Sequence, residues 1–463
     1  MTARPSTGPQ LINELQAILG ERLSTSTYDI DSHGEDEGRQ PAASPDAVAY
    51  TLTNEEVATT VKACAARSTP VIAFGAGTSL EGQIQAIHGG VSIDVSRMNK
   101  ILEVNVDDLD CRVQAGITRS QLNVELEKQG LHFPIDPGAD ASIGGMTATG
   151  ASGTTAVRYG TMRENILGLT VVLADGRIIR TGGRARKSSA GYDLTRLFIG
   201  SEGTLGVITE IQLRLQPLPE AMSAAVCPFE TLEGAVDTVV EVLQAGIPVA
   251  RCELMDESSI RAVNAYSKVD YPEKPTVFFE FHGGPKSVEE QAQMTGDIAN
   301  EHGAGAFEWA AQREDREKLW DARHKSYYAI KALRPGSKGW PTDVAVPISR
   351  LAECIRESRN DAEDKGLMAP ILGHIGDGNF HVVFMLDADD PAELETVMGV
   401  NARMVDRALA MGGTATGEHG IGVGKLGALR AQHGEGVDVM RSIKLALDPE
   451  NLMNPGKVVD LAT

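Results

Sequence analysis

The 463-residue sequence predicts an α+β protein with two principal domains. Its length exceeds that of most single domains, and strands and helices alternate differently on the two sides of Pro217-Leu-Pro-Glu220. In addition, residues 135–160 form a glycine-rich stretch with no helix or strand pattern. We therefore predict an N-terminal helix and wrap at 1–44, a first domain at 45–218, a second at 219–447, and a C-terminal segment at 448–463 that returns to the first domain.

The amino-acid composition indicates which kinds of molecule the protein can bind. Lys and Arg number 43 against 64 Asp and Glu, which gives a formal net charge of −21. Such a surface repels nucleic acid and favours basic partners. No apolar run is long enough to cross a bilayer, and the first ten residues lack the apolar core of a signal peptide. The five cysteines are scattered, without a Cys-x-x-Cys pair, so we expect neither an iron–sulfur site nor disulfides, and a cytoplasmic location, free or at a membrane surface.

The first domain is predicted to be rich in strands. Apolar positions at helical spacing predict a short helix before Gly20, and residues 21–44 are polar. Asn54 is expected to cap a helix that runs to about Arg67. The expected strands lie at 48–52, 70–74, 91–95, 101–105, 112–115, 167–174, 178–180, 197–200 and 206–215, with a helix at 120–130.

The loop from Gly75 to Gly82 nearly matches the Gly-x-Gly-x-x-Gly motif of dinucleotide-binding folds. The third glycine is displaced, and the segment that follows is too short for a crossover helix. We therefore interpret Gly75 to Ser79 as a phosphate-binding nest of backbone N–H groups instead of a nicotinamide site.

The stretch from Ile135 to Gly160 has six glycines with small Ala, Ser and Thr residues between them. Glycine is used where the backbone adopts positive φ or comes very close to another group. A flexible linker would lack Ile143, Met146 and Val157, so we interpret the stretch as the wall of a large cofactor site. A second glycine loop, Gly200 to Gly206, is also bare enough to contact a ligand.

The second domain is predicted to alternate strands with amphipathic helices and to cover the substrate. The expected strands lie at 224–229, 250–254 and 276–282, and the expected helices at 231–244, 287–301 and 313–333.

His374 and His381 flank Asp377-Gly378, a strong signal for a two-residue hairpin turn. A turn there pairs His374 directly with His381, with β-carbons about 5 Å apart on one face. Two imidazoles so placed can bind one divalent ion; a pair of buried, hydrogen-bonded histidines is the alternative. Downstream, Glu418 could complete a set of two histidines and one carboxylate, and the adjacent His419 could act as a base.

Together these motifs resemble the flavoprotein family of D-2-hydroxyacid dehydrogenases with the vanillyl-alcohol-oxidase or p-cresol methylhydroxylase (PCMH) type of FAD fold, and within it the cytochrome-linked D-lactate dehydrogenase branch. The resemblance extends from about residue 45 to the end, and its motifs are specific as a set. The residues that carry it are Phe74 to Gly82, Asp136 to Ser142, Ala148 to Thr154, Val157 to Met162, Ser201 to Gly206, His374 to His381, Thr416 to Gly422 and Asn454 to Lys457.

The resemblance implies a two-lobed FAD-binding domain and an α+β cap domain. Because the first glycine loop has Thr78 and no histidine, it implies non-covalent FAD. The residues implied to bind FAD are Gly75, Ala76, Gly77, Thr78, Ser79, Pro137, Gly138, Ala141, Ser142, Gly144, Gly145, Thr149, Ser152, Gly153, Tyr159, Gly160, Glu202, Gly203, Gly206, Ile208 and Asn454.

The resemblance also implies His374, His381 and Glu418 as ligands of a divalent metal (Zn, Mn, Fe or Co), His419 as general base, and Arg323 as the group that binds the substrate carboxylate. The implied reaction is oxidation of D-lactate, or of glycolate or a longer D-2-hydroxyacid, with electrons passed to a cytochrome or quinone. Pro341-Thr342, where a dicarboxylate-specific branch is expected to carry a lysine, favours a monocarboxylate. A metallohydrolase and a non-catalytic subunit of a flavin complex are the rival hypotheses, and a homodimer is compatible with the sequence.

Overall fold

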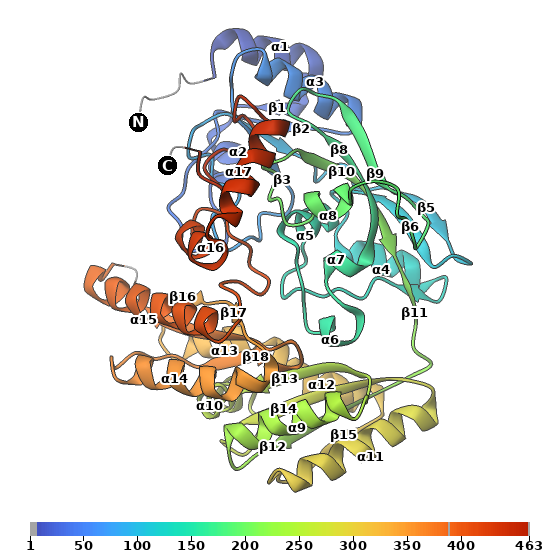
Figure 1. Ribbon diagram of the computed structural model, residues 1–463, viewed down its shortest axis with the longest axis vertical. Coiled ribbons are helices and arrows are strands. Elements are labelled where there is room, and N and C mark those ends of the chain that lie inside the picture. Colours follow the sequence, from blue (N-terminus) through green and yellow to red (C-terminus); the bar gives the residue numbers. More distant parts are fainter. Residues whose placement is uncertain (1–6, 388, 462–463) are drawn as a thin grey trace. The chain divides into compact units, whose positions relative to one another are not determined.

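A computed structural model describes residues 7–387 and 389–461 and has mixed helices and sheets, as predicted (Figure 1). Contacts divide the chain into two compact units. The first unit comprises 7–152, Gly160–Leu218 and 418–461, and the second comprises Gly153–Tyr159 and Pro219–Gly417. One division lies after Leu218, residues 418–461 group with the first unit, and residues 153–159 group with the second; the domain bounds inferred from the sequence stay a prediction.

One sheet of the first unit has the strand order β1-β2-β4-β3, with β2, β4 and β3 parallel. Helix α1 contacts β1 and β2 of this sheet and lies beside α3 (Figure 1). The prediction of Asn54 as the cap of α3 is wrong. The helix is capped by the preceding residue, Thr53, which has an extended backbone and whose side chain accepts from Glu56 N. The bounds are β1 (Leu23–Ser24), β2 (Ala47–Tyr50), β3 (Val71–Phe74), β4 (Val91–Asp94), α1 (Pro9–Leu19), η1 (Gly20–Arg22), α2 (Thr27–Ser32) and α3 (Asn54–Ala65).

The other large sheet of this unit is antiparallel, in the order β5-β6-β10-β8-β9. Both sheets contribute to one apolar core, in which Phe133 and Phe198 are buried. The remaining elements of the unit are β5 (Ile101–Asn105), β6 (Asp110–Gln114), α4 (Arg119–Glu127), β7 (Leu131–His132), α5 (Ile143–Thr149), α7 (Met162–Asn165), β8 (Ile166–Val172), β9 (Ile178–Gly182), α8 (Leu194–Phe198), β10 (Val207–Arg214), β11 (Gln216–Pro217), α16 (Leu426–His433) and α17 (Gly436–Leu447).

Two further local predictions are wrong in this unit. The expected strand at 197–200 includes the end of helix α8, which Asp193 caps by accepting from Arg196 N. The glycine-rich stretch, expected to be irregular, contains short helices. Ser142 begins α5 by accepting from Gly145 N, and Gly150 ends it in the left-handed conformation at φ 67°. Cap residues at both ends therefore form a helix where the apolar period is too short to predict one.

The second unit is built on one antiparallel sheet, in the order β15-β12-β14-β13-β18-β19-β16, with β17 also paired to β19. The strands are β12 (Ala221–Pro228), β13 (Val249–Met255), β14 (Thr276–Gly283), β15 (Glu308–Ala310), β16 (Lys338–Pro341), β17 (Val344–Ala345), β18 (Ile371–His374) and β19 (Asn379–Leu386).

Helices cover this sheet. Apolar residues of α10, α12 and α13 pack on Met255, Phe278 and Leu372, whereas α9 and α11 contact the same central strands and α14 lies beside α15 (Figure 1). The predicted helix at 313–333 is broken at Lys325. The bounds are α6 (Ala156–Tyr159), α9 (Leu232–Gln244), α10 (Glu257–Ser267), α11 (Pro285–Glu301), α12 (Arg313–His324), α13 (Ser326–Ala332), η2 (Ile348–Arg350), α14 (Leu351–Glu363), η3 (Ile375–Asp377) and α15 (Pro391–Ala410).

Across residues 7–387 and 389–461, no helix has both the length and the apolar character that a bilayer crossing requires. All five cysteines are buried and free of disulfides. Burial raises the pKa of Cys64 to about 12, which keeps this thiol protonated and unreactive at neutral pH.

Candidate active site

The two histidines of the predicted hairpin lie together in the second unit, but in a different register. His381 pairs with Leu372, and His374 pairs with Glu253 on β13. The predicted direct pairing of the two histidines is therefore wrong. The cause is that Ile375–Asp377 forms a 3-10 turn that ends at Gly378, at φ 74°, in place of a two-residue turn. The imidazoles are still neighbours, with ring centroids 5.4 Å apart and planes at 81°.

The hydrogen bonds of these histidines fix their tautomers. His381 Nδ1 is 2.8 Å from the carbonyl oxygen of Thr342, which can only accept. His374 Nδ1 is 2.7 Å and 2.9 Å from the two carboxylate oxygens of Glu253, a side chain with no exposed surface. In each neutral ring Nδ1 therefore carries the proton and Nε2 carries the lone pair. This is how metal-binding histidines are usually oriented, so the pair fits a divalent cation.

Glu253 also holds the predicted substrate-binding arginine. Arg323 Nη2 lies 2.6 Å from Glu253 Oε2, and its Nη1 donates to Ser326 Oγ at 3.2 Å. Only 8% of Arg323 is exposed, so a charged pair is required to keep it there. Its Nε is buried without a hydrogen-bond partner among the described residues. The structure thus places Arg323 beside His374, with one unused donor that could serve an anionic ligand.

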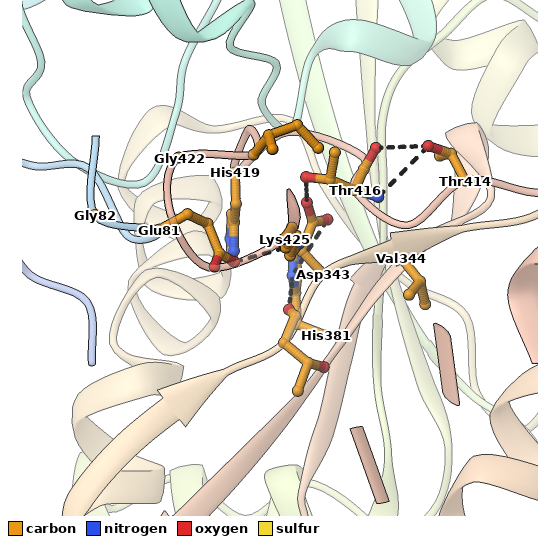
Figure 2. A network of polar contacts seen from close by, with 12 residues as sticks. Glu81, Gly82, Asp343, Val344, His381, Thr414, Thr416, His419, Gly422 and Lys425 are labelled. Carbon is orange, nitrogen blue, oxygen red and sulfur yellow. Dashed lines mark hydrogen bonds and ion pairs between the residues drawn. The ribbon is translucent and has the colours of Figure 1, made fainter. Parts of the chain in front are cut away.

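A second buried acid, Asp343, lies beside His381, with Nδ1 and Oδ1 4.0 Å apart. Its Oδ1 accepts from Asn379 Nδ2 at 2.7 Å and its Oδ2 from Thr416 Oγ1 at 2.6 Å, as Figure 2 shows for Thr416. Gly417 follows, and a β-carbon there would lie 2.3 Å from Asn379 Nδ2. The end of the second unit is therefore packed tightly on the strand that carries His381.

Glu418 and His419, predicted as metal ligand and base, begin the last segment of the first unit. Side chains of the same unit hold the loop that carries them. Glu202 accepts from Ile421 N and Gly422 N, each at 2.7 Å, and Gln83 Nε2 donates to the carbonyl of His419 at 2.7 Å. Burial raises the pKa of Glu202 to about 7, although these two N–H donors favour the ionised form.

Glu81 holds the next part of this loop. Its carbonyl oxygen accepts from Val423 N at 2.9 Å and Gly424 N at 3.0 Å. Its carboxylate lies 3.3 Å from Lys425 Nζ, an ion pair drawn in Figure 2. The glycine-rich loop is thus fixed along most of its length.

Most residues of the predicted FAD wall belong to the first unit. A β-carbon on Gly75 would lie 2.4 Å from Ser142 Oγ, so the first glycine loop meets the start of α5 at a distance that only glycine allows. A β-carbon on Gly138 would meet nothing within 4 Å, and Ser201 Oγ is buried without a partner among the described residues. Close backbone approach and an unused hydroxyl fit a large polar cofactor.

Several residues of the predicted FAD set are engaged by the protein itself. Glu202 binds the loop described above. Asn454 is 1% exposed, its Nδ2 donates to the carbonyls of Gln83 and Glu202, and its Oδ1 accepts from Lys457 Nζ. Ile208 is a core residue of β10. Tyr159 belongs to the second unit, with Gly153. Their contact with FAD, like that of the other predicted residues, stays a prediction.

Tyr159 begins a series of interacting polar side chains that the sequence did not indicate. Its hydroxyl is 2.8 Å from His282 Nδ1, His282 Nε2 is 2.7 Å from Glu280, and Glu280 pairs with Arg251 at 3.2 Å. Sequence reasoning also missed Glu253, Asp343, Gln83 and Asn379. The available signal was an acid inside an apolar strand, as in Arg251-Cys-Glu-Leu-Met255, because a buried charge needs a partner.

Two family models and several relatives match this chain. The family model for FAD linked oxidases, C-terminal domain, matches residues 218–458, and that for the FAD binding domain matches 45–182. The chain is 47% identical to a probable mitochondrial D-lactate dehydrogenase of Danio rerio (99% of this chain, 94% of the relative) and 44% identical to a mitochondrial D-lactate dehydrogenase [cytochrome] of Arabidopsis thaliana (97% and 80%).

Two proteins of lower sequence identity also match this chain. The chain is 34% identical to glycolate oxidase subunit GlcD of Bacillus subtilis, over 89% of each chain. A crystal structure of p-cresol methylhydroxylase with substrate bound matches the fold with a TM-score of 0.77, at 17% identity, over 98% of this chain and 97% of that one.

Proposed function

Because the chain belongs to the FAD-linked oxidase family and is an oxidoreductase like the cytochrome-type D-lactate dehydrogenases, we propose that it oxidises D-lactate, or a related D-2-hydroxy monocarboxylate, to the 2-oxo acid. The observation that carries this proposal is the placement of Glu253, which orients His374 through Nδ1 and holds Arg323 beside it. The proposed cation ligand and the proposed carboxylate-binding group would thus lie together, as a 2-hydroxyacid requires.

His374 and His381 would hold the divalent metal through Nε2. Glu418 is proposed as the third ligand, because it follows Gly417, whose backbone is packed against Asn379. A bound divalent cation supplies a Lewis acid that lowers the pKa of a substrate hydroxyl, and FAD supplies the hydride acceptor. His419 would accept the hydroxyl proton, and Arg323 would orient the substrate through its carboxylate.

The electron acceptor is proposed to be a cytochrome, as in the name of the Arabidopsis relative. The net charge of −21 suits a basic protein partner. Two of the relatives are named as mitochondrial, and the cytoplasmic location predicted for this chain stays a prediction. The Bacillus relative keeps glycolate as the second candidate substrate. Family membership argues against the metallohydrolase hypothesis.

The test is anaerobic mixing of the purified flavoprotein with D-lactate, L-lactate or glycolate, followed at the flavin absorbance bands. We expect D-lactate to bleach the wild-type flavin. His419→Ala should keep its flavin and lose at least about 100-fold in bleaching rate, because general-base catalysis contributes that much. Treatment with a chelator should slow bleaching, and one divalent metal should restore it. Bleaching of His419→Ala at the wild-type rate would refute the proposed base.

A further inference from the structure

The loop that carries Glu418 and His419 contains Gly417, Gly420 and Gly422, and glycine gives a backbone more freedom than any other residue. A catalytic base, however, must be held to within about 0.5 Å of its productive position. Some other part of the chain therefore has to supply the rigidity that the loop sequence lacks.

Glu202 supplies part of it. Both of its carboxylate oxygens accept from the loop, one from Ile421 N and one from Gly422 N, each at 2.7 Å. Glu202 is 5% exposed and has φ 52°, in the left-handed region that non-glycine residues rarely adopt. A β-carbon on Gly420 would lie 2.5 Å from Glu202 Oε1, so the loop approaches this carboxylate as closely as a glycine permits.

Gln83 supplies the other part, and it touches the proposed base directly. Its Nε2 donates to the carbonyl of His419 at 2.7 Å, while its Oε1 accepts from Glu81 N at 2.9 Å. The amide is thus held at one end and holds His419 at the other. Gln83 is 4% exposed, so water does not compete for these bonds.

The C-terminal segment joins these two supports. Asn454 Nδ2 donates to the carbonyl of Gln83 at 2.9 Å and to that of Glu202 at 2.7 Å. Lys457 Nζ donates to Asn454 Oδ1 at 2.7 Å, which leaves both amide hydrogens for the two carbonyls. Gln83 and Glu202 are therefore fixed to each other as well as to the loop.

We propose that Glu202 and Gln83 are positioning residues for His419, which hold the backbone of residues 419–422 so that the imidazole is fixed for proton transfer. This inference rests on the proposed role of His419 as general base. It assigns to Glu202 a function in placing the base, beyond the contact with FAD that its motif implies.

The first test is Glu202→Gln in the FAD-loaded protein. Glutamine keeps the shape, but its amide nitrogen faces one of the two loop N–H groups, so one bond is lost. We expect flavin reduction by D-lactate to slow by about 10- to 100-fold, as misplacement of a catalytic group by about 1 Å does. FAD content should be unchanged. Hydrogen–deuterium exchange at the amides of Ile421 and Gly422 should accelerate at least about tenfold.

Gln83→Met removes the hydrogen bond to the carbonyl of His419 and leaves Glu202 unchanged. It therefore tests the same proposal if Glu202→Gln does not fold. Glu210→Gln is the matched control, because Glu210 is a buried glutamate of the same unit that pairs with Arg112 and contacts no residue of this loop in the described interactions. It should leave both flavin reduction and loop exchange unchanged.

Wild-type reduction rates or unchanged loop exchange in Glu202→Gln and Gln83→Met would overturn the proposal. So would a loss of FAD in proportion to the loss of activity, because that would make these residues cofactor supports. His419→Ala is run in parallel. If it reduces flavin normally, the proposed base is refuted, and the positioning role with it. If it is inactive while both other variants are normal, only the positioning role is refuted.

Discussion

Glu253 contacts both the proposed metal ligand His374 and Arg323. Replacement by glutamine removes its charge, and the effects on the pair with Arg323 and on the orientation of His374 can be measured separately. Arg323 would keep an uncompensated guanidinium at 8% exposure, and removal of one partner of a buried ion pair costs about 3–5 kcal/mol. The glutamine oxygen can still accept one bond, so we expect about 3 kcal/mol. For a unit of about 200 residues this corresponds to a fall in Tm of roughly 6–12 °C.

The same substitution should weaken metal binding, because loss of the partner that orients a ligating histidine costs about 10- to 100-fold in affinity. The assays are thermal unfolding and equilibrium dialysis of chelator-treated protein against Zn²⁺ or Mn²⁺. Glu308→Gln is the control, since Glu308 is an exposed acid on β15 of the same sheet. If Glu253→Gln melts at the wild-type temperature and binds metal equally well, the reasoning about this carboxylate is wrong.

Two further predictions concern the second unit. Gly417→Ala would place a methyl group 2.3 Å from Asn379 Nδ2, whose amide is held by Asp343 and Val344, so we expect flavin reduction to fall at least about tenfold. Gly427→Ala, where a β-carbon meets nothing within 4 Å, should have no effect, and equal rates for the two variants would refute the packing argument. Hydrogen bonds from Arg403 lower the pKa of Asp361 below its usual 3.8. The pair therefore stabilises the fold above about pH 3.8, and the benefit is lost as pH falls through the lower folded value. Asp361→Asn should cost up to about 1 kcal/mol in urea unfolding at pH 6, because Arg403 is half-exposed, and the difference should vanish at the acid limit of the folded state. A cost that grows on acidification would contradict the assigned direction.

The strands and helices with a clear local period could be predicted from sequence. β3 and β14 follow their apolar runs, and α9 follows its amphipathic pattern from Thr231, which caps it. The helices of the glycine-rich stretch could not be predicted, because their caps decide them and their apolar positions are too few.

The candidate site shows where sequence reasoning stops. The turn at Asp377-Gly378 predicted that the two histidines meet, and the rings are adjacent. The register was wrong because His374 pairs with Glu253, which lies 121 residues earlier in the chain. Gln83 and His419 are separated by 336 residues, so no local pattern connects them. Ligand-type residues could be recognised locally, whereas the groups that orient them are chosen by tertiary contacts.

The segment Gly153–Tyr159 leaves the first unit and packs in the second, where a β-carbon on Gly376 would lie 2.6 Å from Val157 Cγ2. The turn between the proposed metal ligands His374 and His381 thus packs against a side chain encoded far upstream of the rest of its unit. A fragment that spans only 219–417 would lack that support, and a chimaera that exchanges the cap between relatives should carry these seven residues with it. Domain boundaries drawn only along the sequence would assign residues 153–159 to the first unit, although they pack in the second.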